Sequence, residues 1–217
     1  MTAVGTVDVR AGLADPRDLD PVIAHLEAGG LAVHPTETVY GFGGLATPEA
    51  VAALRRLKGR ADQRPFLVLL PAADAAPGLV WTDEARALAG VFWPGAVTLV
   101  LADPTGSFPA GVRSPAGTVA VRVSGHPVAR ALVERLGRPM TSSSANATGA
   151  PPAATAAEAC AAAPADSELW VVDAGRLPPS EPSTVVDCTG AKPVVVRAGA
   201  TPVSRLRCVL PGIHGER

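Results

Sequence analysis

Apolar residues recur along this chain in two alternating patterns. Short runs that are almost wholly apolar, such as 66–70 (FLVLL), are typical of strands that are buried on both faces. Stretches with apolar residues three and four positions apart, such as 16–29, predict amphipathic helices. Together the patterns predict helices at 16–29, 48–57, 83–91, 126–136 and 154–163, and strands at 31–33, 66–70, 97–101, 118–123, 139–143, 169–172, 184–186 and 194–196.

Strands and helices alternate through most of the chain, and this order predicts an α/β protein. Apolar strands separated by helices are typical of parallel sheets, whereas the last strands follow one another without helices and are expected to pair antiparallel. We therefore expect an open, twisted sheet of mixed parallel and antiparallel strands with flanking helices. A length of 217 residues suits a single domain, 1–217, with a core of about 16–200 and a C-terminal tail, 201–217, that packs or frays.

Composition narrows the class of protein. Apolar residues make up 47% of the chain and the formal net charge is −1, so the protein is globular and has no overall basic field that would draw it to nucleic acid. Its three cysteines are far apart and odd in number, which excludes a disulfide framework and favours a reducing compartment. We see neither a secretory leader nor an apolar run of membrane-spanning length, so we expect a soluble, cytoplasmic protein without membrane contact.

The positive charge is concentrated in one short segment. Five cations lie within ten residues there, and the only acid among them is Asp62. Two interpretations are open: a solvated helix end, which composition alone favours, or a local site for an anion such as phosphate. The five cations are Arg55, Arg56, Lys58, Arg60 and Arg64.

A pair of glycines raises the possibility of a dinucleotide site. Gly41-x-Gly43-x-x-Ala46 follows a predicted strand and precedes a predicted helix, as in the loose dinucleotide-binding fingerprint. The acid that should follow about twenty residues later would be Asp62, which lies before the next strand instead of at its end. The match is weak, and a dinucleotide-dependent oxidoreductase would rest on it alone. Neither a P-loop motif nor a GxSxG nucleophile motif occurs.

Three further segments suit a pocket for a small polar molecule. Residues 35–41 place two threonines, an acid and a tyrosine between a strand and flexible glycines, although a hydroxyl-capped turn explains them at least as well. Arg122 shares an otherwise apolar strand, and one face of it, with Thr118. Its guanidinium must therefore be paired or face a cavity, unless the strand is an edge and Arg122 faces solvent. Residues 142–146 (SSSAN) offer hydroxyl and amide groups that could orient a phosphate.

Taken together, these segments resemble the YrdC/Sua5 family. The resemblance is carried by six motifs in one order across roughly residues 19–200, which is far more specific than any one of them alone. The chain ends soon after the last motif and so resembles the short, single-domain members. The motifs are 34–41 (HPTETVYG), 58–60 (KGR), 93–100 (WPGAVTLV), 118–122 (TVAVR), 142–149 (SSSANATG) and 183–187 (STVVD).

Members of that family are L-threonylcarbamoyladenylate synthases, so the resemblance implies a nucleotidyltransferase. It implies that L-threonine and bicarbonate form an N-carboxy-threonine, which attacks the α-phosphate of ATP and releases pyrophosphate, for the t6A modification of transfer RNA. It also implies a YrdC-like fold with a concave, basic face. ATP would be a substrate, Mg²⁺ is the expected counter-ion of its triphosphate, and the downstream t6A transferase machinery would be the partner, with a possible tRNA contact.

The aligned motifs also imply roles for individual residues. Lys58, Arg60, Ser144 and Asn146 would be the catalytic group, with the cations on the triphosphate and the other two orienting it. Arg122 would bind the carboxylate of threonine as a bidentate fork. ATP would contact Arg60, Arg64, Thr118, Ser144, Pro152 and Arg197, and L-threonine would contact Thr36, Thr38, Arg122, Ser142 and Ser183. No carboxylate pair in the sequence identifies metal ligands.

A binding module is the alternative to an enzyme. The clustered cations could hold structured RNA on a basic concave surface without any turnover. The net charge of −1 and the scarcity of aromatic residues, 4% of the chain, count against this alternative.

Overall fold

The computed structural model describes residues 2–59, 64–146 and 150–215, and within them ten strands form one mixed sheet. The strand order is β1-β8-β2-β3-β7-β4-β6-β5-β9-β10, with β1/β8, β8/β2, β4/β6 and β5/β9 parallel and the other pairs antiparallel. This confirms the predicted fold class of a mixed sheet with flanking helices. The strands are β1 (Thr2–Asp8), β2 (Leu31–His34), β3 (Gly41–Gly43), β4 (Leu67–Leu69), β5 (Val97–Ala102), β6 (Thr118–Arg122), β7 (Met140–Ser144), β8 (Glu168–Asp173), β9 (Thr184–Asp187) and β10 (Val194–Arg197).

The helices begin and end where local chemistry dictates. Thr47 caps α2 by accepting a hydrogen bond from the amide of Ala50, and Pro48 follows at the first helical position. Gly137, with a φ of 58°, ends α4 in the left-handed conformation that glycine adopts without strain. The helices are α1 (Asp20–Glu27), α2 (Pro48–Leu57), α3 (Asp83–Phe92), α4 (Pro127–Leu136), α5 (Ala156–Ala161) and α6 (Val203–Val209), with 3₁₀ turns at Pro16–Leu19 and Ala73–Ala75.

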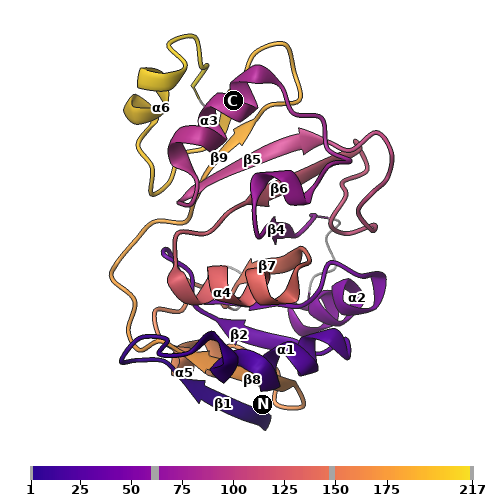
Figure 1. Ribbon diagram of the computed structural model, residues 1–217, viewed down its shortest axis with the longest axis vertical. Coiled ribbons are helices and arrows are strands. Elements are labelled where there is room, and N and C mark those ends of the chain that lie inside the picture. The colour runs from indigo at the N-terminus through magenta and orange to yellow at the C-terminus, as the bar shows by residue number, and fades with distance from the viewer. Residues whose placement is uncertain (1, 60–63, 147–149, 216–217) are drawn as a thin grey trace.

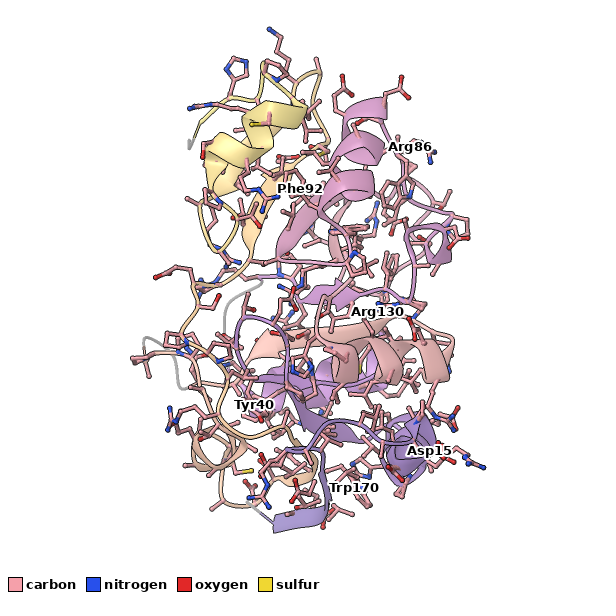
Figure 2. The ribbon with its side chains drawn as sticks, turned by 60° about the vertical axis from the view of Figure 1, so that its left-hand side comes forward. Asp15, Tyr40, Arg86, Phe92, Arg130 and Trp170 are labelled. Carbon is pink, nitrogen blue, oxygen red and sulfur yellow. The ribbon has the colours of Figure 1, made fainter. Side chains whose placement is uncertain are left out.

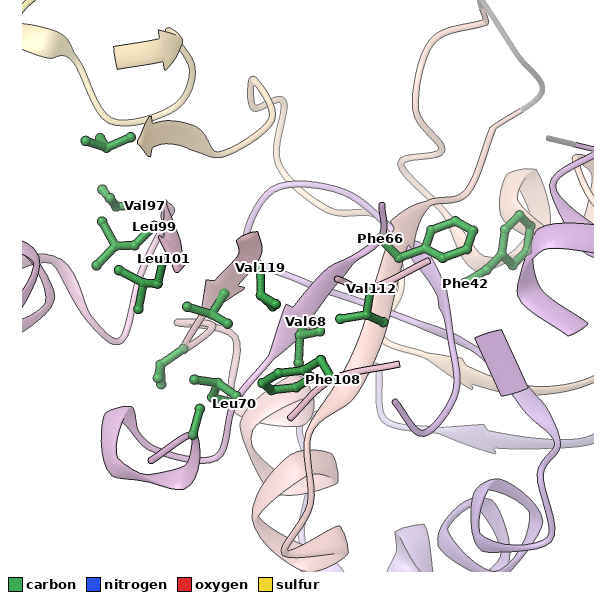
Figure 3. Packing of buried hydrophobic residues seen from close by; sticks show 14 of the residues in the cluster. Phe42, Phe66, Val68, Leu70, Val97, Leu99, Leu101, Phe108, Val112 and Val119 are labelled. Atoms are coloured by element: carbon green, nitrogen blue, oxygen red, sulfur yellow. The ribbon is translucent and has the colours of Figure 1, made fainter. Parts of the chain in front are cut away.

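The sheet runs along the length of the molecule. We call the part from β1 to β7 the lower part and the part from β4 to β10 the upper part, and the two meet where β7 pairs with β4. Figure 1 shows β1, β8 and β2 in the lower part with the N-terminus, and β5, β9 and α6 in the upper part. One apolar cluster runs through both parts and includes Phe66, Val68, Phe108 and Val112, as Figure 3 shows. A second cluster packs α1 and α4 against the sheet in the lower part. The polar site lies near the middle, where β3, β7, β4 and β6 run side by side.

Three elements are present that the sequence patterns do not predict. β1 carries Gly5, where a Cβ atom would lie 2.4 Å from the ring of Trp170, so glycine is needed for that indole to cover the strand. β3 contains two glycines, which have low strand propensity. The tail expected at 201–217 packs in part: it contains α6, and Leu206 is fully buried. None of the helices within the described residues is long and apolar enough to cross a membrane.

Candidate active site

A polar pocket of about 230 Å³ opens at the centre of the sheet. It gathers all five residues expected to hold an amino acid, from segments that are up to about 160 positions apart in the sequence. Its walls are therefore built by the tertiary fold and not by any one loop. The lining residues are Thr36, Thr38, Val39, Gly41, Pro65, Phe66, Leu67, Arg122, Ser142, Ser143, Ser144, Pro182, Ser183 and Arg197.

Lys58 lies beside the serine-asparagine segment at the edge of this pocket. Its Nζ atom is 2.8 Å from the main-chain oxygen of Ser144 and 3.1 Å from Oδ1 of Asn146. The hydroxyl of Ser144 donates to the same Oδ1 over 2.8 Å, and the amide nitrogen of Asn146 donates to Ala150. The two distant segments thus meet, and an ammonium group stands next to a hydroxyl and an amide. Arg60 lies outside the described residues.

Arg122 is buried and paired. Only 2% of the residue is exposed, and its Nη2 atom lies 3.3 Å from Oε2 of Glu37, which also accepts a hydrogen bond from the hydroxyl of Ser124. Burial lowers the pKa of Arg122, and the nearby Glu37 opposes that effect. Within the described residues, Nε of Arg122 is buried without a hydrogen-bond partner. The alternative that Arg122 faces solvent on an edge strand is therefore wrong, and the guanidinium retains a buried donor.

Glu37 is the partner that the sequence analysis did not assign. Burial tends to raise the pKa of this carboxyl, but Arg122 and Ser124 stabilise its charged form, so its pKa lies below the usual value. Its Oε1 atom is buried and has no partner within the described residues. A buried arginine requires a nearby acid, and that requirement was the available signal for this pair.

The threonine turn both caps itself and faces the pocket. The hydroxyl of Thr36 donates to the main-chain oxygen of Val39 over 2.7 Å and accepts from the amides of Thr38 and Val39. Tyr40 does not line the pocket. Tyr40 is labelled in the lower part of Figure 2. Its hydroxyl donates to the main-chain oxygen of Gly175 over 2.8 Å and accepts from the amide of Ala174. Burial raises the pKa of Tyr40 to about 12, so it anchors the turn as a neutral phenol.

Ser183 and Arg197 form the opposite wall. Arg197 donates from Nε and Nη2 to the main-chain oxygen of Ser183 over 3.1 and 2.7 Å, and the Ser183 hydroxyl lies 2.8 Å from that of Thr98. Burial lowers the pKa of Arg197. Two guanidinium groups thus reach one small pocket, which favours an anionic group in its occupant.

Among the expected ATP residues that the structure describes, three do not line the pocket. Thr118 shares a face of β6 with Arg122 but lies four residues away, about 13 Å along the strand, and its hydroxyl bonds that of Ser114 over 2.8 Å. Pro152 precedes Ala153, which pairs through its backbone with Tyr40 and Ala145. Arg64 is exposed and directly precedes the pocket residue Pro65. A nucleotide would have to extend well beyond this pocket to meet all three.

The glycine segment is not a dinucleotide turn. Gly41 and Gly43 belong to β3, in the middle of the sheet between β2 and β7. In the dinucleotide fingerprint the glycines form the turn between a strand and a helix and expose their amides to phosphate. Main-chain groups of β3 are instead engaged by the neighbouring strands, which removes the basis for an oxidoreductase.

Resident metal binding is not supported by the residues that the structure describes. No group of three or more His, Cys, Asp or Glu side chains that could hold an ion occurs among them. Glu37 lies within the turn that lines the pocket, between Thr36 and Thr38, and its carboxylate already contacts Arg122 and Ser124.

Comparison with known proteins identifies relatives along nearly the whole chain. The Sua5/YciO/YrdC family model, described as "Telomere recombination", matches residues 24–199. A Mycobacterium tuberculosis protein is 40% identical over 204 residues, which are 91% of this chain and 93% of that protein. The threonylcarbamoyl-AMP synthase of Bacillus subtilis is 33% identical over 91% of this chain, which spans only 59% of the length of that relative.

Solved structures agree with the sequence relatives. Pyrococcus abyssi Sua5 complexed with L-threonine superposes with a TM-score of 0.90 at 30% identity, over 97% of this chain and 62% of the Sua5 chain. Escherichia coli YciO superposes with a TM-score of 0.81 over 94% of this chain, and at 23% identity it supports the fold alone. The ordered motifs, the shared fold and the matched family model agree, and the chain belongs to the Sua5/YciO/YrdC family.

Proposed function

We propose that this protein is a threonylcarbamoyl-AMP synthase, which forms L-threonylcarbamoyladenylate and pyrophosphate from L-threonine, bicarbonate and ATP. One observation carries the proposal: a small pocket with two guanidinium groups and several hydroxyls opens directly beside the contact between Lys58 and residues 144–146. Its volume of about 230 Å³ suits a ligand of the size of an amino acid. The names of the relatives, threonylcarbamoyl-AMP synthase and Sua5 complexed with L-threonine, agree with it.

The pocket supplies complementary groups for L-threonine. The guanidinium of Arg122, held by Glu37, would bind the α-carboxylate, and its buried Nε offers a second donor for a two-point contact. Hydroxyls of Thr38, Ser142 and Ser183 would contact the polar groups of the substrate. The guanidinium and hydroxyl groups come from the upper and lower parts of the sheet, so the fold fixes their separation.

The reaction needs positioning and charge neutralisation more than a covalent nucleophile. The amine of threonine bonds the carbon of bicarbonate, water leaves, and the resulting carbamate oxygen bonds the α-phosphorus while the bond to pyrophosphate breaks. Lys58, together with Arg60, would neutralise charge on the phosphates. Ser144 and Asn146 would hold their oxygens, and Arg64, Thr118, Pro152 and Arg197 would extend the ATP site. Mg²⁺ would enter bound to ATP.

The decisive test is pyrophosphate release from ATP with each substrate omitted in turn. We expect release only when both L-threonine and bicarbonate are present, and we expect the adenylate product by mass spectrometry. Release that does not depend on threonine would refute the proposal, and so would its absence in the complete mixture. Tight RNA binding with a steep salt dependence and no turnover would favour the RNA-binding alternative. A transferase of the t6A modification would receive the product, and direct tRNA contact stays a prediction.

A further inference from the structure

His34, at the end of β2, makes a hydrogen bond with the pocket residue Ser142. The residue is fully buried, its Nδ1 atom lies 3.3 Å from the main-chain oxygen of Pro35, and its Nε2 atom lies 3.3 Å from the hydroxyl of Ser142. A carbonyl oxygen only accepts hydrogen bonds, so the Pro35 contact assigns the ring proton to Nδ1. Nε2 is then an acceptor, and Ser142 donates its hydroxyl proton to it.

The ring reaches Ser142 by crossing a strand that has no side chains in its way. β3 lies between β2 and β7, with His34 opposite Gly41 and Gly41 opposite Ser144, so these positions share one face of the sheet with Ser142. A Cβ atom at Gly41 would lie 3.1 Å from Oγ of Ser142 and 3.2 Å from Nε2 of His34. One at Gly43 would lie 3.0 Å from the same Nε2. The two glycines are therefore the space through which the histidine contacts the pocket wall.

The imidazole keeps this role across the physiological pH range. Burial lowers the pKa of His34 to about 4, with Arg122 and His126 adding to that effect and the Pro35 contact opposing it. The ring is consequently neutral near pH 7 and presents an unprotonated Nε2. Since that nitrogen takes the Ser142 proton, only lone pairs of the Ser142 oxygen are left for a pocket occupant.

We propose that His34 is a positioning residue for the amino group of the substrate, acting through Ser142. By fixing the hydroxyl as a donor to Nε2, it leaves the Ser142 oxygen as an acceptor at the pocket wall, where an amine N–H can bind. Arg122 on β6, two strands away from Ser142 on β7, would bind the carboxylate. Arg122 and Ser142 together would then set the direction in which an α-amino acid lies. This inference rests on the proposed function, because it assumes that the occupant is L-threonine.

The test compares two ligands that differ only in the amine: L-threonine and 3-hydroxybutyrate. We expect His34→Phe, which keeps the ring volume and removes the acceptor, to weaken L-threonine binding by about fivefold to tenfold, the usual size of one hydrogen bond. Binding of 3-hydroxybutyrate and of ATP should not change. The matched control is Thr141→Val. Thr141 precedes Ser142 on β7 and points to the opposite face of the sheet, and the change removes its buried hydrogen bonds with Gly44. It should lower stability without changing the preference for the amine.

Several outcomes would overturn the inference. Equal weakening of both ligands in His34→Phe would mean a purely structural role, and unchanged binding of both would mean no role. A nitrogen-15 NMR spectrum that places the His34 proton on Nε2 would refute the geometry without any substrate. If His34→Phe does not fold, Gly41→Ala should give the same selective loss. Wild-type protein that turns over L-threonine while the variants keep its selectivity would refute this inference alone, whereas wild type that binds no L-threonine would refute the proposed function as well.

Discussion

The Nζ atom of Lys58 lies 2.8 Å from the main-chain oxygen of Ser144, although 86 positions separate the two residues. The contact brings the end of α2 to the end of β7, at the rim of the polar pocket. We expect Lys58→Ala to lower turnover about a hundredfold to a thousandfold, the usual loss for one electrostatic contact to a transition state. The measurement is pyrophosphate release with saturating L-threonine and bicarbonate.

Arg56→Ala is the matched control for Lys58→Ala. It removes a cation from an exposed position of the same helix, two residues away. Its turnover should stay within about twofold of the wild type. Salt screens an exposed charge, which therefore contributes little to the stabilisation of the transition state. Similar turnover in both variants would mean that Lys58, like Arg56, is only a solvent-exposed charge at the end of the helix.

The ion pair between Glu37 and Arg122 should matter for both stability and binding. Glu37→Gln keeps the shape but leaves a buried guanidinium without its counter-charge. We expect a loss of at most about 3 kcal/mol in the free energy of unfolding, at the low end for a buried pair because the Glu37 side chain is 22% exposed. The KM for L-threonine should rise as Arg122 loses its fixed position. Urea unfolding and initial rates measure the two effects.

A double substitution separates those two effects. Glu37→Gln combined with Arg122→Met removes both charges, and it should recover much of the stability while the KM for L-threonine stays high. Recovery of binding in the double variant would place the carboxylate contact elsewhere. A single Glu37→Gln variant with wild-type stability would show that the acid is not needed to bury the arginine.

Sequence patterns could predict the mixed sheet and its flanking helices, whereas most of the pocket residues came from the family resemblance. The runs 97–101 and 118–123 became β5 and β6 almost unchanged, because long apolar stretches fit a doubly covered sheet whatever their neighbours are. β3 was missed because two of its three residues are glycines, which have low strand propensity, and it forms a strand only by pairing with β2 and β7. Strand pairing between segments far apart in sequence leaves no local signal.

The sequence analysis named most of the side chains that meet around the pocket, but not the contacts between them. Arg122 was expected to be paired or in a cavity, and it is both. Its partner Glu37 could not be chosen, since several acids were available and the choice depends on where the loop after β2 lies relative to β6. The concave basic face and the catalytic, ATP-binding and threonine-binding roles of the individual residues stay predictions.

Asp103 should make stability depend on pH in the acid range. Asp103 is fully buried, and burial tends to raise the pKa of its carboxyl. Hydrogen bonds from Ser107 and Phe108 and the charge of Arg113 outweigh that tendency, so the pKa lies below the ordinary 3.8. A lowered folded-state pKa means that the stabilisation is present above the ordinary value and is lost as the pH falls through the folded value.

Asp103→Asn tests this pH dependence. The variant should be less stable than the wild type at pH 7 by on the order of 1–3 kcal/mol, because the 103–117 loop loses acceptors. The difference should shrink as the pH falls below the ordinary pKa of 3.8 and through the lower folded-state pKa, where the wild-type carboxyl becomes protonated. Asp166→Asn, at an exposed position, is the control. A constant difference across the acid range would show that hydrogen-bond geometry, and not the charge, stabilises the loop.

Two glycines with opposite surroundings should respond to alanine in opposite directions. At Gly43 a Cβ atom would lie 2.3 Å from the main-chain oxygen of Thr141, so the backbone of β3 or β7 must shift, and we expect a loss of about 1–3 kcal/mol. At Gly90, an exposed position within α3, a Cβ atom would meet nothing within 4 Å. Alanine there should add about 0.5–1 kcal/mol through helix propensity. Urea unfolding of the two variants measures both effects, and a Gly43→Ala variant as stable as the wild type would contradict the close packing that leaves His34 its path to Ser142.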